Sequence, residues 1–234
     1  MTELLNSREV VPGLVYRSAA PYGLDAEDVH TVVNALALGA VADLRGPRER
    51  VLVPWLGLES AGVELLDVAM VASADDAALA LQTPQDLGEL YLDWLDLKRE
   101  TVVRALSPLA SGTPLLLHCA AGKDRTGVLA ALVGLLAGHE RERIVADYTA
   151  TAANMGQVKA AMLQAYREVV PSETLAHLAE ENAPIIMSAP AEAMEVFLDG
   201  VEQHYGGVGG FLNSTHLHPG VAAALRGRLR EVQG

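Results

Sequence analysis

The chain contains a single cysteine, Cys119, which lies directly after an apolar run and six residues before an arginine. It belongs to the string HCAAGKDRTG, residues 118–127. A thiol at the start of a helix is close to the positive end of the helix dipole and to unpaired backbone N–H groups, which favour the thiolate. A lone cysteine is often a buried packing residue, but the charged and small residues that follow favour a nucleophile.

The residues after Cys119 suit a loop that wraps a tetrahedral oxyanion. Five residues separate the thiol from Arg125, which is enough chain to curl with successive N–H groups pointing inward. Arginine binds two oxygens of such an anion at once, which lysine does less well. The predicted phosphate-binding residues are Ala120, Ala121, Gly122, Lys123, Arg125 and Thr126.

The motif C-x5-R, followed by Thr126 and Gly127, resembles the signature loop of the cysteine-dependent protein tyrosine and dual-specificity phosphatases. The string GKDRTG is similar to an atypical bacterial branch that acts on phosphotyrosine, sometimes on phosphoserine or phosphothreonine, and often on phosphoinositides. Four stretches elsewhere resemble that branch: GLVYRSA, DLRGPRE, DYTATAAN and AEAMEVFLDGVEQHYGGVGGFL. The family's opening segment, similar to NFRDLGG, has no counterpart in residues 3–13, which read ELLNSREVVPG.

The resemblance implies that Cys119 attacks phosphorus in line and forms a thiophosphate, while Arg125 and the loop amides hold the equatorial oxygens. It implies that Asp124 protonates the leaving oxygen and then activates water, and that Thr126 hydrogen-bonds the sulfur. Asp75 or Asp76 is the alternative proton donor. No cofactor and no metal are expected, because no spacing of His, Cys and Asp residues suggests a metal site.

Five polar residues near the loop or its strand are candidates for supporting roles. His118 lies on the apolar strand, where we expect a hydrogen-bonded core residue that orders the loop rather than a base. Lys123 is either solvated or binds a second phosphate, as in phosphoinositides. Asp43 and Arg45 end a neighbouring strand, where an ion pair that braces the loop and a contact with substrate are both open. Arg17 presents the same two alternatives.

Hydrophobic patterns predict the elements that position these residues. Segments 39–45, 62–70 and 113–119 are predicted strands, the last covered on both faces. Helical spacing predicts a helix over 24–38, a long surface helix over 84–106 and a buried helix over 126–138. Later helices are predicted over 155–170, 172–181, 190–205 and 219–231.

This order predicts an α/β fold: a cysteine-phosphatase-like three-layer arrangement with a central, mainly parallel sheet flanked by helices. Ligands of such sheets bind at the carboxyl ends of the strands, where Cys119 lies. The length of 234 residues favours a single phosphatase domain over 1–234. Within it we expect an added helical lid at about 154–190.

The chain carries 17 basic and 30 acidic residues, a formal net charge of −13. This charge disfavours nucleic acid and anionic membranes as partners. The start of the chain has no signal peptide pattern, and the longest apolar run, 128–137, is too short to span a bilayer. We expect a cytoplasmic protein, with export without a recognisable signal left open; the oligomeric state is also left open.

The resemblance therefore implies a metal-independent protein tyrosine phosphatase that acts on phosphotyrosine in proteins, and on phosphoserine or phosphothreonine as a wider option. Two alternatives remain open at this point: a phosphoinositide phosphatase, and a phosphate-binding module that lacks turnover. The expected partner is accordingly a phosphorylated protein or a phosphoinositide.

Overall fold

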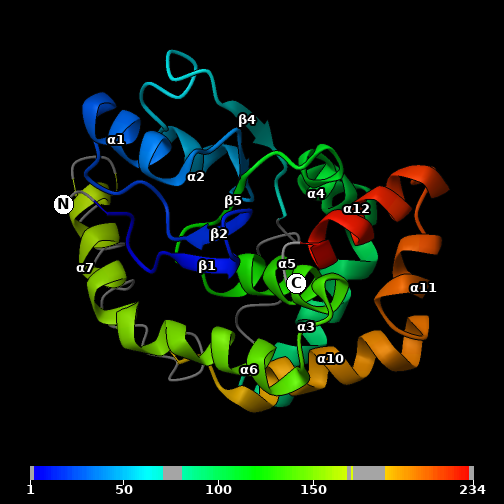
Figure 1. Cartoon of the computed structure of the whole chain (residues 1–234). Coiled ribbons are helices and arrows are strands. Elements are labelled where there is room, and N and C mark those ends of the chain that lie inside the picture. Colours follow the sequence, from blue (N-terminus) through cyan, green and yellow to red (C-terminus); the bar gives the residue numbers. More distant parts are fainter. Residues whose placement is uncertain (1–2, 71–80, 168–169, 171–187, 232–234) are drawn as a thin grey trace.

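The structure, a computed structural model, describes residues 3–70, 81–167, 170 and 188–231 (Figure 1). Helices surround a central sheet on both faces. The predicted helix over 172–181 lies outside the described residues, as does most of the predicted lid. Within the described ranges, no helix combines the length and the apolar character needed to cross a membrane.

The described part of the chain forms one five-stranded sheet in the order β1-β2-β5-β3-β4. The strands are β1 (Arg8–Val11), β2 (Val15–Ser18), β3 (Ala40–Asp43), β4 (Glu64–Asp67) and β5 (Leu115–His118). Strands β2, β5, β3 and β4 run parallel, and β1 pairs antiparallel with β2. The mainly parallel α/β sheet predicted from the sequence is confirmed, and β5 lies at its centre.

The register brings polar residues together at the carboxyl edge of the sheet. Ser18 of β2 and Asp43 of β3 are both paired with His118 of β5. Since parallel strands end at the same edge, the loop after His118 begins among these side chains. This edge is where the sequence predicts the site.

The sheet separates two apolar cores. Helix α1 (Ala26–Leu36) packs on one face, where Val41 and Leu116 are buried. Helix α5 (Asp124–Ala137) packs on the other face, where Leu115 and Leu117 are buried in the larger core. The alternation along β5 shows why this strand is apolar throughout: both of its faces are covered.

The remaining helices extend the larger core and the outer surface. They are α2 (Pro47–Leu52), α3 (Pro84–Leu97), α4 (Arg99–Leu106), α6 (Arg141–Thr149), α7 (Met155–Tyr166), α10 (Ala191–Tyr205), α11 (Val208–Asn213) and α12 (Pro219–Glu231), with short 3-10 helices η2 (Ser107–Ser111) and η3 (Ala150–Asn154).

The prediction of one long surface helix over 84–106 is wrong. The segment divides into α3 and α4 at Lys98, whose φ of −121° and ψ of 25° leave the helical region. Much of α3 is buried rather than exposed, because α10 packs along it. A Cβ on Gly200 of α10 would lie 2.1 Å from the Leu92 side chain, so the two helices approach closely where a glycine allows it.

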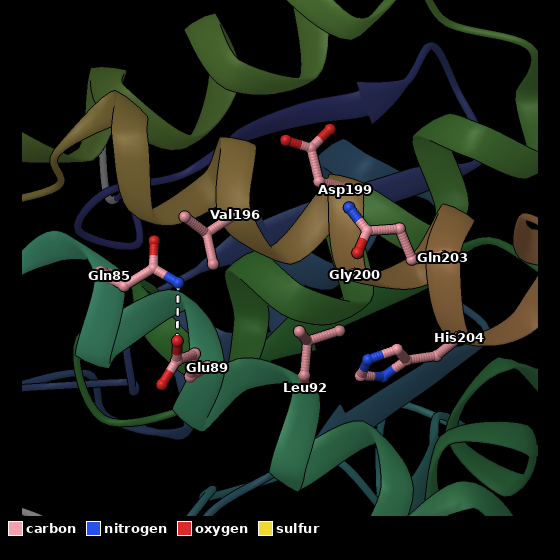
Figure 2. A pocket seen from close by; sticks show the side chains of 8 residues that line it. All are labelled: Gln85, Glu89, Leu92, Val196, Asp199, Gly200, Gln203 and His204. Carbon is pink, nitrogen blue, oxygen red and sulfur yellow. Dashed lines mark hydrogen bonds between the residues drawn. The ribbon is translucent and has the colours of Figure 1, made fainter.

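The close crossing of α3 and α10 leaves a groove of about 460 Å³ on their outer side (Figure 2). Polar side chains line much of it, and Gln85 donates a hydrogen bond of 2.6 Å to Glu89. The groove is therefore a polar surface feature of the helical layer, formed by elements other than the loop after β5.

Helix α7 ends at Tyr166, inside the predicted segment 155–170. Tyr166 and Met162 pack with Ala20 and Val53 in a small apolar cluster that is separate from the two main cores. Helix α7 therefore contacts the segment after β2 and the end of α2, both of which lie next to the carboxyl edge of the sheet.

Candidate active site

The loop after β5 joins the central strand to the buried helix, as predicted. Strand β5 ends at His118 and α5 begins at Asp124, so Cys119 and residues 120–123 form the connection. Gly122 has a φ of +66°, and a Cβ there would lie 2.3 Å from the carbonyl oxygen of Ser18. Glycine is required at this position both by its backbone angle and by the close approach of β2.

The carbonyl groups of the loop are all bound by neighbouring elements. The Ala20 N–H donates to Ala120 O at 3.0 Å, and Asn6 Nδ2 donates to Ala121 O at 3.0 Å and to Gly122 O at 3.2 Å. Arg17 Nη2 donates to Gly122 O at 2.6 Å. In a trans peptide the N–H points opposite to the carbonyl, so the amides of residues 121–123 face away from these donors. That orientation suits backbone N–H groups that converge on an anion.

Arg125 is held by Glu49 of α2. Nη1 donates to Oε2 at 2.7 Å and Nη2 to Oε1 at 2.8 Å. Glu49 Oε2 also accepts the Gly46 N–H at 2.7 Å, which fixes the carboxylate at the start of α2. Burial alone would raise the pKa of Glu49, but the hydrogen bonds and charge of Arg125 outweigh it and hold that pKa below its ordinary value.

The same pair keeps the guanidinium charged. Burial alone would lower the pKa of Arg125, but the hydrogen bonds that it donates to Glu49 and its attraction to Cys119, Glu49 and Asp124 raise that pKa. The guanidinium and the thiol therefore interact electrostatically across the loop.

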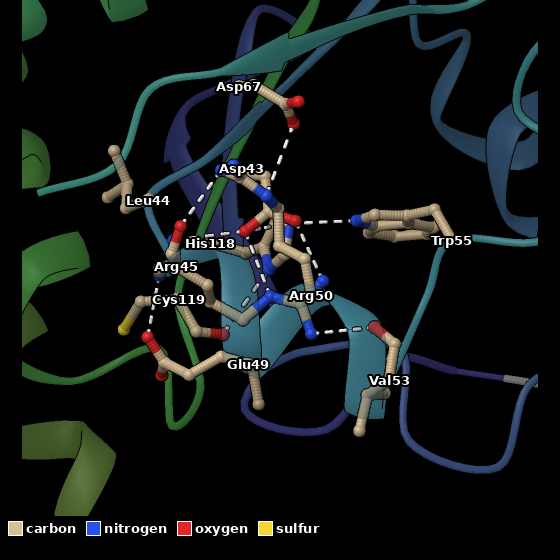
Figure 3. A network of polar contacts seen from close by, with 12 residues as sticks. Asp43, Leu44, Arg45, Glu49, Arg50, Val53, Trp55, Asp67, His118 and Cys119 are labelled. Carbon is tan, nitrogen blue, oxygen red and sulfur yellow. Dashed lines mark hydrogen bonds and ion pairs between the residues drawn. The ribbon is translucent and has the colours of Figure 1, made fainter.

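A buried network of Asp43, Arg45 and His118 lies behind the loop (Figure 3). Arg45 donates to both carboxylate oxygens of Asp43, at 2.9 and 2.7 Å, and through Nη1 to Val53 O at 2.8 Å. Trp55 Nε1 donates to His118 Nε2 at 2.8 Å, which leaves the ring proton on Nδ1, 3.3 Å from Cys119 O. These contacts support the predicted bracing roles, and they give His118 the place of a hydrogen-bonded core residue.

A second brace ties the loop to α6. Arg17, whose carboxylate partner is Asp147, also binds Gly122 O as described. Arg8 Nε donates to Asp147 Oδ1 at 2.7 Å. Burial alone would raise the pKa of Asp147, but Arg17 and Arg8 hold it below its ordinary value. The bracing alternative for Arg17 is the one that its contacts support.

Asp124 lies at the start of α5 and is bound from α3. Tyr91 donates its hydroxyl proton to Asp124 Oδ1 at 2.5 Å, and Tyr148 Oη lies 2.8 Å from Tyr91 Oη. Lys123 Nζ lies 3.3 Å from Asp124 Oδ1 and donates to Ser188 O at 2.7 Å. The alternative that Lys123 is solvated is wrong, because its side chain is buried by the segment that leads into α10.

A sequence model of the tyrosine phosphatase family matches residues 2–231 of the chain. The chain belongs to this family. It is 31% identical over 134 residues to the triple specificity protein phosphatase PtpB of Mycobacterium tuberculosis, a match that covers 54% of this chain and 47% of PtpB. It is 27% identical over 146 residues to the tyrosine-protein phosphatase of Nostoc commune, covering 61% and 50%. The chain thus spans about half the length of the curated relatives it matches.

Among solved structures, the chain resembles the core catalytic domain of the PP-IP phosphatase SIW14 from S. cerevisiae. The sequences are 20% identical and the TM-score is 0.39, over 78% of this chain and 91% of that chain.

One expectation for this tyrosine phosphatase family member is not met. Thr126 does not hydrogen-bond the sulfur of Cys119: its hydroxyl oxygen is buried in the first turn of α5 and has no hydrogen-bond partner among the described residues. Asp75 and Asp76, the alternative proton donors, lie outside the described residues. Within the described ranges, no three His, Cys, Asp or Glu side chains gather where they could hold a metal ion.

Several residues of the family member's site were not predicted from its sequence. They are Asn6, Arg8, Glu49, Trp55, Tyr91, Asp147 and Tyr148. Each acts on the loop from a distant part of the chain. The only local signal was the stretch GPRE, in which a proline at the first helical position and a glutamate two residues later indicate a helix that begins at Pro47 and includes Glu49.

Proposed function

We propose that this protein is a cysteine-dependent phosphomonoesterase that dephosphorylates phosphotyrosine in proteins, with phosphoserine and phosphothreonine as further substrates. The observation that carries the proposal is the loop of residues 119–125, which has its carbonyls bound outward and which joins Cys119 to a guanidinium that Glu49 fixes. A phosphate-binding module without turnover would have no use for the thiol at this position.

The hydrogen bonds of Arg125 leave it two N–H groups for substrate. Glu49 accepts one from each terminal nitrogen, and Leu44 O accepts the second from Nη1 at 3.4 Å. A guanidinium has five N–H groups, so Nε–H and one N–H of Nη2 remain within the described contacts. Two donors on one edge of a planar group match two oxygens of a phosphoryl group.

In the first step the thiolate of Cys119 attacks phosphorus opposite the leaving oxygen. The S–P bond forms and the P–O bond breaks, while Arg125 and the loop amides bind the three equatorial oxygens as their charge shifts. Asp124 gives its proton to the leaving oxygen, so the alcohol or phenol departs neutral.

In the second step water attacks the thiophosphate. Asp124, now ionised, takes a proton from the water as its oxygen bonds to phosphorus, and the S–P bond breaks to regenerate the thiolate. Inorganic phosphate leaves, and Asp124 is again protonated for the next cycle. The step needs no group beyond the residues of the loop and water.

The test is hydrolysis of p-nitrophenyl phosphate in the presence of EDTA, with wild type and Cys119→Ser compared. We expect EDTA-resistant turnover in the wild type and none above background in the variant, with 32P-labelled substrate leaving a covalent label only on the wild type. Turnover that EDTA abolishes, or that survives in Cys119→Ser, would contradict the thiolate mechanism.

The partners of this reaction are phosphorylated proteins, with phosphoinositides as the alternative substrate class, and its place of action is the cytoplasm. The M. tuberculosis relative is named a triple specificity protein phosphatase, which supports protein substrates. Measuring kcat/KM on phosphotyrosyl peptides, phosphoseryl peptides and phosphoinositide vesicles under the same conditions tests which substrate class is preferred. A higher kcat/KM on the vesicles than on both peptides would favour the alternative.

A further inference from the structure

The two oxygens of Asp124 have different surroundings. Oδ1 accepts the Tyr91 hydroxyl at 2.5 Å and lies 3.3 Å from Lys123 Nζ. Oδ2 has no hydrogen-bond partner in the described part of the chain, and the side chain is 28% exposed. One oxygen is therefore fixed by the protein and the other is open.

The tyrosines that fix Oδ1 form a directional chain. A hydroxyl carries one proton, and Tyr91 directs it to Asp124; the contact of 2.8 Å with Tyr148 is then made by the Tyr148 proton. Burial and the nearby negative charge of Asp124 raise the pKa of both tyrosines, so both stay protonated. Hydrogen bonds linked in this way strengthen one another.

Packing holds the two hydroxyls in place. Tyr91 is on α3 and Tyr148 on α6, and their rings meet edge to face with centroids 6.1 Å apart. Phe197 of α10 makes a similar contact with Tyr91 at 6.3 Å. A Cβ on Gly127 would lie 3.0 Å from the Tyr148 ring, so α5 itself closes against this side chain. Neither ring has room to turn away from Asp124.

We infer that Tyr91 and Tyr148 are positioning residues for proton transfer: Tyr148 donates to Tyr91, Tyr91 donates to Oδ1, and this places the transferable proton of Asp124 on Oδ2. This inference rests on the proposed phosphatase function. When Asp124 is protonated, Oδ1 still accepts from Tyr91, so the carboxyl proton lies on the open oxygen. After Asp124 gives that proton to the leaving oxygen, the same hydrogen bond stabilises the carboxylate that is formed.

The test compares kcat/KM over a series of aryl phosphates, from 2,4-dinitrophenyl phosphate to phenyl phosphate. Good leaving groups depart without protonation, whereas poor ones need it. We expect Tyr91→Phe to reduce kcat/KM about tenfold for phenyl phosphate and less than about twofold for the dinitrophenyl ester. Tyr148→Phe, one step further from the carboxylate, should reduce the phenyl phosphate rate about threefold in the same pattern.

Tyr205→Phe is the matched control, because Tyr205 donates its hydroxyl proton to Asp96 on the helical layer outside the site. It removes the same kind of hydrogen bond and should leave the dependence on the leaving group unchanged. Suppose that the wild type is active, that this activity requires Cys119, and that kcat/KM depends on the leaving group in the same way in Tyr91→Phe and Tyr205→Phe. The positioning role is then wrong and the phosphatase function stands. If wild type has no Cys119-dependent activity, both fail. Should Tyr91→Phe not fold, as judged by thermal melting, Tyr148→Phe decides by the same comparison.

Discussion

Two bidentate arginine–carboxylate pairs lie at the same edge of the sheet, and they differ in how far they are buried. In the Asp43–Arg45 pair both side chains are 1% exposed, and Val53 O accepts from Arg45 Nη1. In the Glu49–Arg125 pair the exposed fractions are 26% and 16%, and Leu44 O accepts from Arg125 Nη1. Each arginine uses three of its five N–H groups in these contacts, so exposure is what separates a buried brace from a pair whose remaining donors can reach a ligand.

The pairs also differ in how the chain brings them together. Asp43 and Arg45 are two residues apart at the end of one strand, whereas Glu49 and Arg125 are 76 residues apart. A local pair stabilises the strand end in which it occurs. A non-local pair fixes one element relative to another, so it can hold a substrate-binding group at a set position on the sheet edge.

The largest effect is expected from Arg125→Lys. Lysine keeps the charge but cannot donate to Glu49 and to two phosphate oxygens in one plane. We expect kcat/KM for p-nitrophenyl phosphate to fall about 10³-fold, with the midpoint of urea unfolding nearly unchanged. A variant that retains most of its activity would show that the open donors of this pair are not used.

For the buried Asp43–Arg45 pair, we expect a change in the free energy of unfolding rather than in activity. Arg45→Met leaves Asp43 as an unpaired buried charge, so we expect the free energy of unfolding to fall by about 4 kcal/mol. The double variant Asp43→Leu/Arg45→Met removes both charges and should recover much of that loss. Chemical denaturation at pH 7 measures both. Loss of activity in Arg45→Met without loss of stability would place Arg45 in the binding machinery.

The variant Glu49→Gln tests whether Glu49 positions Arg125. The amide keeps the shape of the carboxylate, but its nitrogen cannot accept from Arg125, so one of the two parallel hydrogen bonds is lost. We expect kcat/KM to fall about tenfold, because the guanidinium is less well fixed. The exposed variant Glu59→Gln, on the segment before β4, is the control for the change in charge. Equal rates in the two variants would contradict the positioning of Arg125 by Glu49.

The smallest effect is expected in the pH dependence of stability. Because Arg125 holds the folded-state pKa of Glu49 below its ordinary value of 4.5, the pair stabilises the fold fully above that pH. The contribution is lost as pH falls through the lower, folded-state value. The difference in unfolding free energy between wild type and Glu49→Gln should therefore be constant at neutral pH and shrink below pH 4.5. If this difference in unfolding free energy stays the same in acid, the lowered pKa of Glu49 is contradicted.

Elements with local signals were predictable from the sequence. Asp25 caps α1 in a capping box, and Gly138 ends α5 in the left-handed region, both within residues that the pattern indicates. Strands β1 and β2 were missed although they are as long as the predicted strands β3 and β5, because charged residues interrupt their apolar runs: Arg8 and Glu9 in β1, and the buried Arg17 in β2. The division of segment 84–106 at Lys98 has no nearby proline or glycine to indicate it in the sequence.

In the candidate site, too, residues with local signals were predictable and residues that depend on distant contacts were not. Cys119, Asp124 and Arg125 lie within seven consecutive residues, so their spacing could be read directly. Tyr91 is 33 residues from Asp124, and Tyr148 is 57 residues from Tyr91. No periodicity or motif links positions so far apart, because their contact depends on how helices pack. Sequence alone therefore indicated the reacting groups and the nearby bracing candidates, but not the tyrosines that hold Asp124.

The hydrogen bonds from Asn6 to the carbonyls of the loop carry a consequence for folding. Asn6 and Gly122 are 116 residues apart, and Gly122 also presses against the end of β2. Closing so large a separation is slow compared with forming helices, so the loop acquires its shape late, after the first hairpin has docked beside β5. A nascent or partly unfolded chain would thus carry the complete motif without its geometry, and the onset of turnover would report completion of the whole fold.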